Sequence, residues 1–141
     1  MAMLADNSSH SAEWANLLKQ AIAAREYAYA PYSNYKVGAA LLTTGGKIYQ
    51  GCNIENAAYS PSNCAERTAI FKAVSEGECD FKAIAVVTQD GAAPCGVCRQ
   101  VIREFAPHLT IIIGDAGGHY EVVALPDILP HSFGPENLGV K

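Results

Sequence analysis

Two short cysteine motifs constrain this chain more than any other feature of its 141 residues. The first, Cys64-x-Glu66, places a carboxylate two residues after a thiol, and the second, Cys95-x-x-Cys98, places two thiols one helical turn apart. If each motif opens a helix, the three thiols can share one metal ion. Three thiolates leave one position of a tetrahedral zinc site open, which is typical of a catalytic zinc rather than a structural one.

The residues beside Cys64 predict how such a site would work. Glu66 follows Cys64 by two residues, about 200° around an ideal helix. This offset makes Glu66 an improbable ligand of the same metal, but it leaves the carboxylate able to approach a water molecule in the open position. We therefore predict that Glu66 shuttles protons to and from that water. Arg67 is the predicted cation that offsets the charge of the thiolates, whereas Arg99 is expected to be a surface charge.

Two other interpretations of the cysteines, neither of which involves a catalytic metal, stay open at this point. A Cys-x-x-Cys pair alone is also typical of a redox site, although a redox site does not need the Cys-x-Glu motif. A structural zinc site would need a fourth ligand, and none of the four histidines stands at ligand spacing. A non-catalytic, zinc-stabilised binding module would tolerate the loss of Glu66, and it gives no reason for an open coordination position. Cys52 and Cys79 are not expected to be ligands.

Composition bounds the class of protein and its partners. The net charge is −4 and no basic stretch is present, so a small-molecule substrate is expected and nucleic acid is not. No apolar run approaches the roughly 18–20 residues of a membrane span, and the first residues lack the pattern of a signal peptide. An odd count of five cysteines indicates thiols of a reducing compartment, and we expect a cytoplasmic protein.

Hydrophobic periodicity predicts one α/β domain over residues 11–141, preceded by a disordered tail at residues 1–10. We expect a first helix capped by Ser11 and ended by Pro31. The remaining predicted elements are strands at 37–43, 48–52, 83–88, 109–113 and 120–125, helices at 64–76 and 95–105, and a helical turn at 126–129. This order predicts a three-layer α-β-α sandwich around a mixed sheet of about five strands.

At these motifs the chain closely resembles the small homotetrameric, zinc-dependent cytidine deaminases of pyrimidine salvage. The resemblance extends over residues 30–33, 37–40, 51–59, 64–67, 94–100 and 129–133. It implies a cytidine deaminase-like fold, one zinc ion per subunit, and a hydrolase that converts cytidine and 2′-deoxycytidine to the uridines and ammonia. A deaminase of another aminopyrimidine nucleoside remains an alternative, because the zinc motifs are shared.

The resemblance also assigns residues that bind the sugar and the base. It implies that Asn53 and Glu55 hold the ribose hydroxyls, and that Ala65 lies against the amide edge of the base. Without the resemblance, Asn53 and Glu55 would be interpreted as caps of the loop that follows a strand.

Three aromatic residues are likewise assigned by the resemblance. Tyr35 would pack its ring against the pyrimidine, at a position where relatives usually carry Phe. Tyr59 and Phe133 would reach the site of a neighbouring subunit, so that each site of the homotetramer is completed by its neighbours. The residues alone would identify all three as ordinary packing aromatics.

Overall fold

A single mixed sheet forms the centre of the computed structural model, which describes residues 10–140. Its strands are β1 (Gly38–Thr43), β2 (Ile48–Cys52), β3 (Phe81–Thr88), β4 (Thr110–Asp115) and β5 (Tyr120–Ala124). They are arranged in the order β2-β1-β3-β4-β5, with β3 and β4 parallel and the other neighbours antiparallel. The predicted mixed, five-stranded sheet is confirmed.

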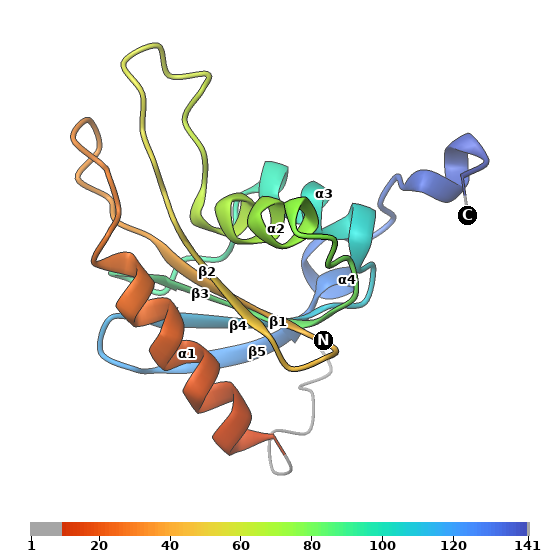
Figure 1. Ribbon diagram of the computed structural model, residues 1–141, viewed down its shortest axis with the longest axis horizontal. Helices are drawn as coiled ribbons and strands as arrows, with labels where there is room; N and C mark the ends of the chain where they lie inside the picture. Colours follow the sequence, from red (N-terminus) through yellow and green to blue (C-terminus); the bar gives the residue numbers. More distant parts are fainter. Residues whose placement is uncertain (1–9, 141) are drawn as a thin grey trace.

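Helices cover both faces of this sheet (Figure 1). Helix α1 (Ser11–Arg25) lies on one face, and α2 (Ala65–Ser75) and α3 (Gly96–Phe105) lie together on the other. A short helix α4 (Leu125–Ile128) follows β5, and a 3₁₀ helix η1 (Pro135–Leu138) stands near the C-terminus. The predicted three-layer sandwich is therefore present.

Alternate residues of the central strands enter two separate cores. In β1, Leu41 packs in the cluster that includes α2 and α3, whereas Leu42 packs in the cluster that includes α1. In β3, Ile84 and Ala85 divide in the same way. Because both faces of these strands are covered, they carry continuous apolar runs rather than an alternation of apolar and polar residues.

Glycines let the helices on both faces approach the β1–β2 hairpin closely. A Cβ atom on Gly38 would lie 2.1 Å from the carbonyl oxygen of Ala21 in α1. A Cβ atom on Gly51 would lie 2.5 Å from the carbonyl oxygen of Ala65 in α2. Any side chain at these two positions would push a helix away from the sheet.

Helix α1 ends at Arg25, earlier than the predicted stop at Pro31. The backbone leaves the helix because Tyr29 pairs with the loop that follows β2. The amide of Tyr29 donates to the carbonyl of Asn53 at 2.9 Å, and its carbonyl accepts from the amide of Glu55 at 2.8 Å. This long-range bridge replaces the helical hydrogen bonds that local sequence favours.

The start of α1 also differs from the prediction. Ser11 is the first helical residue, and the N-cap is His10, whose side chain makes no capping hydrogen bond. Apart from His10, the tail predicted at residues 1–10 lies outside the described residues. Within residues 10–140, no helix has the length and apolar character needed to cross a membrane.

Candidate active site

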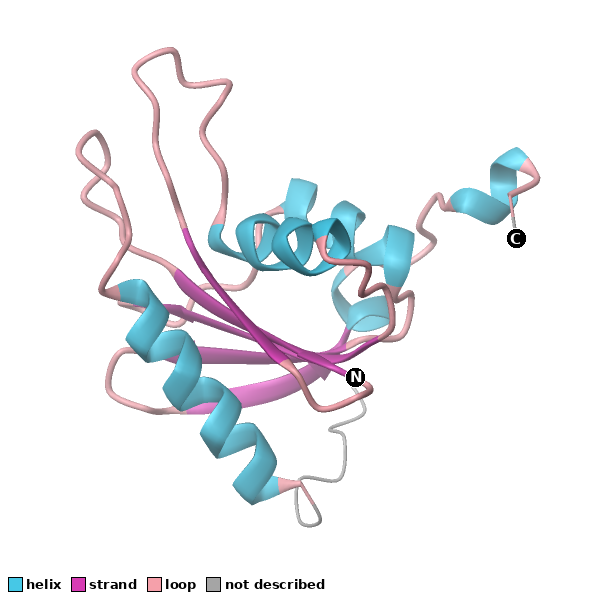
Figure 2. Cartoon of the chain, in the orientation of Figure 1, coloured by secondary structure: helices cyan, strands magenta, loops and turns pink. Residues whose placement is uncertain are grey.

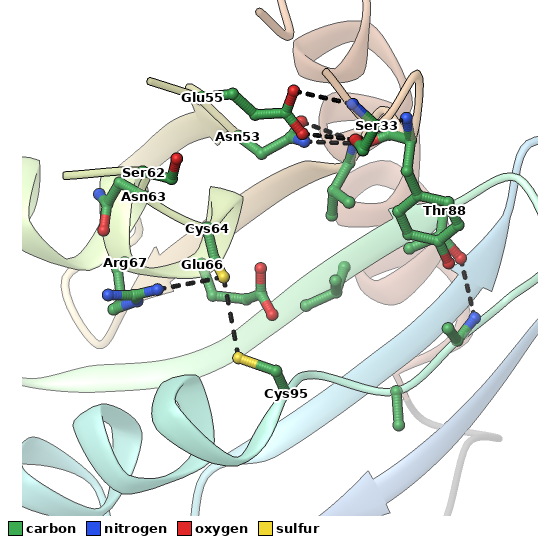
Figure 3. A pocket seen from close by; sticks show the side chains of 15 residues that line it. Ser33, Asn53, Glu55, Ser62, Asn63, Cys64, Glu66, Arg67, Thr88 and Cys95 are labelled. Carbon is green, nitrogen blue, oxygen red and sulfur yellow. Dashed lines mark hydrogen bonds between the residues drawn. The ribbon is translucent and has the colours of Figure 1, made fainter. Parts of the chain in front are cut away.

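Three cysteine thiols meet where the N-termini of α2 and α3 come together. The Sγ atoms of Cys64, Cys95 and Cys98 all lie within 4.8 Å of one another. Cys64 and Cys95 are the N-cap residues of α2 and α3, with extended backbones and no side-chain capping bond. Their sulfur atoms are therefore free to face each other, 3.7 Å apart (Figure 3). Cys98 is buried in the first turn of α3.

The donor set and its spacing fit zinc. Bonds of about 2.3 Å place two sulfur ligands of a tetrahedral zinc about 3.8 Å apart, close to the separation of Cys64 and Cys95. Thiolates at helix N-termini are also stabilised by the partial positive charge there. As predicted, Cys52 and Cys79 stand outside this cluster. The three cysteines are thus positioned to bind a metal ion.

Arg67 supplies positive charge directly to the thiol cluster. Its Nη2 atom donates a hydrogen bond to the Sγ atom of Cys64 at 3.2 Å. Hydrogen bonds from Cys98 and from Arg67 lower the pKa of Cys64 to about 5, against an opposing effect of burial. The neighbouring Cys64 and burial raise the pKa of Cys98. The guanidinium of Arg67 therefore favours the thiolate form of Cys64.

Arg99 differs from the expectation that it is a surface charge. It is half-buried, and its Nε atom donates to the carbonyl of Pro94 at 2.7 Å. Its Nη1 atom donates to the carbonyl of Ile128 at 2.7 Å. Arg99 thus joins the loop before α3 to the end of α4, because both free carbonyls lie within reach of one guanidinium.

Glu66 is a buried carboxyl group beside the thiols. It lies in the first turn of α2 and is only 3% exposed. Figure 3 shows its carboxylate next to the sulfur of Cys64. Burial raises the pKa of Glu66 to about 7, and the charge on Cys64 acts in the same direction. A carboxyl group with this pKa can both accept and release a proton near neutral pH.

The thiols of Cys64 and Cys95 open, together with Glu66, onto a cavity of about 370 Å³. A cavity of this size suits a small molecule, and it lies against two of the three thiols. Four further residues assigned from the sequence line it, namely Tyr35, Asn53, Glu55 and Arg67. The lining also includes residues that the sequence analysis did not assign, namely Ser33, Val37, Ser62, Asn63, Val86, Thr88, Ala92 and Ala93.

Asn53 holds the wall of the cavity through its side chain. Its Oδ1 atom accepts a hydrogen bond from the amide of Val37 at 2.9 Å. Its Nδ2 atom donates to the carbonyl of Tyr35 at 2.7 Å. Within this chain, Asn53 therefore braces the segment that enters β1.

Glu55 holds the same wall further along the chain. Its Oε1 atom accepts hydrogen bonds from the amides of Tyr32 and Ser33 at 2.9 and 3.1 Å, and its Oε2 atom accepts one from the Ser33 hydroxyl. The Ser33 hydroxyl and these amides lower the pKa of Glu55. Glu55 is thus an ionised carboxylate at the cavity wall at neutral pH.

Three residues assigned by resemblance lie outside this cavity lining. Tyr59 is 73% exposed on the long loop between β2 and α2, which Figure 2 shows extending beyond the sheet. Phe133 is 58% exposed, and its carbonyl accepts a hydrogen bond from Gln100 at 2.9 Å. Ala65 is buried in the first turn of α2, directly after Cys64.

One residue of the cavity lining, Thr88, was not predicted but could have been recognised from the sequence. Thr88 is a polar residue at the carboxyl end of β3, an otherwise buried strand that runs parallel to β4. Carboxyl ends of parallel strands commonly meet ligands, so a polar residue there is a candidate. Ser62 and Asn63, immediately before Cys64, had no pattern of their own.

Known deaminases are similar to this chain along most of its length. The family model of the cytidine and deoxycytidylate deaminase zinc-binding region matches residues 12–114. The cytidine deaminases of Sporosarcina psychrophila and Halalkalibacterium halodurans are 51% and 50% identical to this chain over 125 residues. The matched region covers 86% of this chain in both comparisons, and 92% and 95% of the two relatives.

Solved structures extend this similarity to the fold. The crystal structure of cytidine deaminase from Burkholderia pseudomallei matches with a TM-score of 0.81 at 50% identity, covering 84% of this chain and 97% of that chain. The crystal structure of cytidine deaminase from Mycobacterium tuberculosis matches with a TM-score of 0.74 at 36% identity, covering 86% and 98%. Both similarities extend over more than four-fifths of this chain.

Proposed function

This chain belongs to the cytidine deaminase family, and on that premise we propose how its own residues deaminate cytidine and 2′-deoxycytidine. The observation that carries the proposal is the buried Glu66 beside three clustered thiols at one end of a nucleoside-sized cavity. The overall reaction adds water to the base and releases ammonia, so cytidine becomes uridine.

Cys64, Cys95 and Cys98 are the proposed ligands of one zinc ion per chain. When bound, zinc supplies Lewis-acid chemistry that activates water for attack on the ring carbon bearing the amino group. Glu66 accepts a proton from the attacking water and donates it to the adjacent ring nitrogen. It then moves the second proton of the water to the departing amine. The C–N bond breaks, ammonia leaves, and the water oxygen remains as the carbonyl of the base.

Arg67 is the proposed charge partner of this centre. Three thiolates give a divalent zinc site a net negative charge, which opposes the deprotonation of water. The hydrogen bond from Arg67 to Cys64 withdraws part of that charge from the sulfur.

The sugar and the base are bound along the braced wall of the cavity. Asn53 and Glu55 hold the ribose hydroxyls, and Tyr35 presents its ring to the base, with Ala65 at the amide edge. Glu55 retains acceptor capacity, because an ionised carboxylate has about four acceptor sites and three of those on Glu55 are occupied. Since a contact to the 3′-hydroxyl does not distinguish the two sugars, both nucleosides are substrates.

We also propose that the enzyme is a cytoplasmic homotetramer. Large aromatic side chains stay exposed on the single chain, including Tyr27 at 83%, Tyr59 at 73% and Phe133 at 58%. Exposed apolar groups of this kind favour association between subunits. A site built from free thiols also suits a reducing compartment.

An absorbance assay with cytidine tests the function directly. Zinc-loaded protein is expected to convert cytidine to uridine and to release one ammonia per uridine formed. The conversion should stop when a chelator removes the metal and should resume when zinc is added back. If the zinc-loaded protein leaves cytidine unchanged but deaminates another aminopyrimidine nucleoside, the alternative substrate is correct.

Removing the segment after Leu129 is expected to raise the KM for cytidine about 10- to 100-fold and to leave zinc bound. The reason is that Phe133 contributes apolar contact to a neighbouring subunit's site, and such contact from one aromatic ring contributes roughly 1.5–3 kcal/mol. Steady-state kinetics and metal analysis check both parts. A truncated enzyme with the KM of the full chain would contradict the role of this segment.

Point variants separate the role of Phe133 from the loss of the whole segment. Phe133→Ala should reproduce the change in KM, whereas Leu138→Ala, at another exposed apolar residue of the same segment, should not. Co-expression of Phe133→Ala chains with Glu66→Gln chains should restore part of the activity. This rescue requires that Phe133 of one subunit serves the site of another.

A further inference from the structure

Asp90 lies just beyond the end of β3 and contacts the cavity wall from outside. It is not among the residues that line the cavity, but its carboxylate is bonded to two that are. The hydroxyl of Tyr35 donates to Oδ1 of Asp90 at 2.6 Å. The hydroxyl of Thr88 donates to the same oxygen at 3.1 Å. One carboxylate oxygen thus joins two segments of the wall.

The other end of Tyr35 is also fixed. Its amide donates to the Ser33 hydroxyl at 3.0 Å, and its carbonyl accepts from Asn53 at 2.7 Å. The Asp90 bond therefore fixes the hydroxyl end of a residue whose backbone is already held. A ring held at both ends has little freedom to turn away from the cavity, although 39% of the residue is exposed.

A second connection joins the same two segments. The Nε atom of Arg25 donates to the carbonyl of Lys36 at 2.9 Å, and its Nη2 atom donates to Oε1 of Gln89 at 3.1 Å. Two residues beyond Asp90 in the chain, the amide of Ala92 donates to the Thr88 hydroxyl at 2.8 Å. The segment that carries Tyr35 is thus tied to the segment that leads from β3 towards Cys95.

We propose that Asp90 is a positioning residue for the substrate, which acts by holding the Tyr35 ring in the orientation that packs against the base. This inference rests on the proposed function of the cavity as a nucleoside site. Asp90 touches neither the thiols nor the base, so its effect is on binding and not on the proton transfers at Glu66. A hydrogen bond to a charged acceptor is also stronger than one between neutral groups.

The protonation states of the two partners suit this bond. Hydrogen bonds from Tyr35 and Thr88 lower the pKa of Asp90, so the carboxylate is ionised at neutral pH. Burial and the bond to Asp90 raise the pKa of Tyr35, so the phenol keeps its proton. A protonated donor therefore faces an ionised acceptor at neutral pH.

A double-mutant cycle tests the proposal. Asp90→Ala and Tyr35→Phe are each expected to raise the KM for cytidine about five- to tenfold, with kcat changed less than about twofold. The double variant should be no worse than the more affected single variant, because both changes remove the same interaction. Asp90→Asn keeps an oxygen acceptor and should restore most of the affinity. Asp80→Ala, at the other end of β3, is the matched control and should leave KM unchanged.

Three outcomes would overturn the proposal. An unchanged KM in Asp90→Ala would remove the effect itself, and additive effects in the double variant would show that Asp90 does not act through Tyr35. Loss of zinc from Asp90→Ala would show that its role is to place Cys95. Failure of the unmodified enzyme to convert cytidine is different, because it rejects the proposed function and not only the role of Asp90.

Discussion

Replacement of Glu66 by Gln is expected to lower kcat for cytidine by about 10³- to 10⁴-fold while zinc stays bound. The amide has nearly the same shape as the carboxyl group and fits the same buried position, where Glu66 is 3% exposed. It cannot, however, accept the proton of the attacking water or pass it to the ring nitrogen. Single-turnover kinetics and metal analysis of the purified variant measure the two properties separately.

The control for Glu66→Gln is the same substitution at an exposed carboxylate. Glu104 is exposed in α3, the helix that carries Cys98, and Glu104→Gln should keep both zinc and turnover. Normal turnover in zinc-loaded Glu66→Gln would rule out Glu66 as the proton shuttle. A non-catalytic binding module would show no effect of either change on its ligand affinity.

Serine in place of any one of Cys64, Cys95 or Cys98 is expected to abolish zinc binding at stoichiometric metal and to reduce deamination to background. A hydroxyl is a poor ligand for zinc at neutral pH, and two thiolates hold the ion far less tightly than three. Elemental analysis after dialysis, followed by the cytidine assay, checks both effects. The Cys95 variant is the most decisive, because Cys95 is exposed and its replacement does not disturb packing.

Two cysteines outside the cluster provide matched controls. Cys79→Ser and Cys52→Ser should retain zinc and activity, since neither sulfur belongs to the cluster. The pattern also tests the redox interpretation. A redox pair would lose function with Cys95 or Cys98 but would tolerate the loss of Cys64, and that result would exclude a three-thiolate site.

Local patterns in the sequence were sufficient to predict the elements that carry the thiols. The predicted helices at 64–76 and 95–105 correspond to α2 at Ala65–Ser75 and α3 at Gly96–Phe105. Each motif begins at a helix N-terminus, so helical periodicity alone places Cys98 one turn beyond Cys95. Cys64 lies beside Cys95 and Cys98 because α2 and α3 pack on the same face of the sheet.

Long-range contacts account for the features that the sequence did not predict. The end of α1 is set by the pairing of Tyr29 with the loop after β2, and the partners of Arg99 come from two distant carbonyls. The contact of Asp90 with Tyr35 joins residues 55 positions apart, and no spacing rule relates them. Such contacts depend on how the finished layers meet, which a local pattern does not contain.

The close approach of α2 to Gly51 means that a residue without a side chain helps to determine the geometry of the active site. The carbonyl of Ala65 and the amide of Ala69 both lie within 2.6 Å of where a Cβ atom on residue 51 would be. A displaced α2 would carry Cys64 and Glu66 away from α3, although every proposed zinc ligand and the proposed proton shuttle would still be present. The activity of the site therefore depends on the distance between α2 and β2, which stays short because residue 51 of β2 has no side chain.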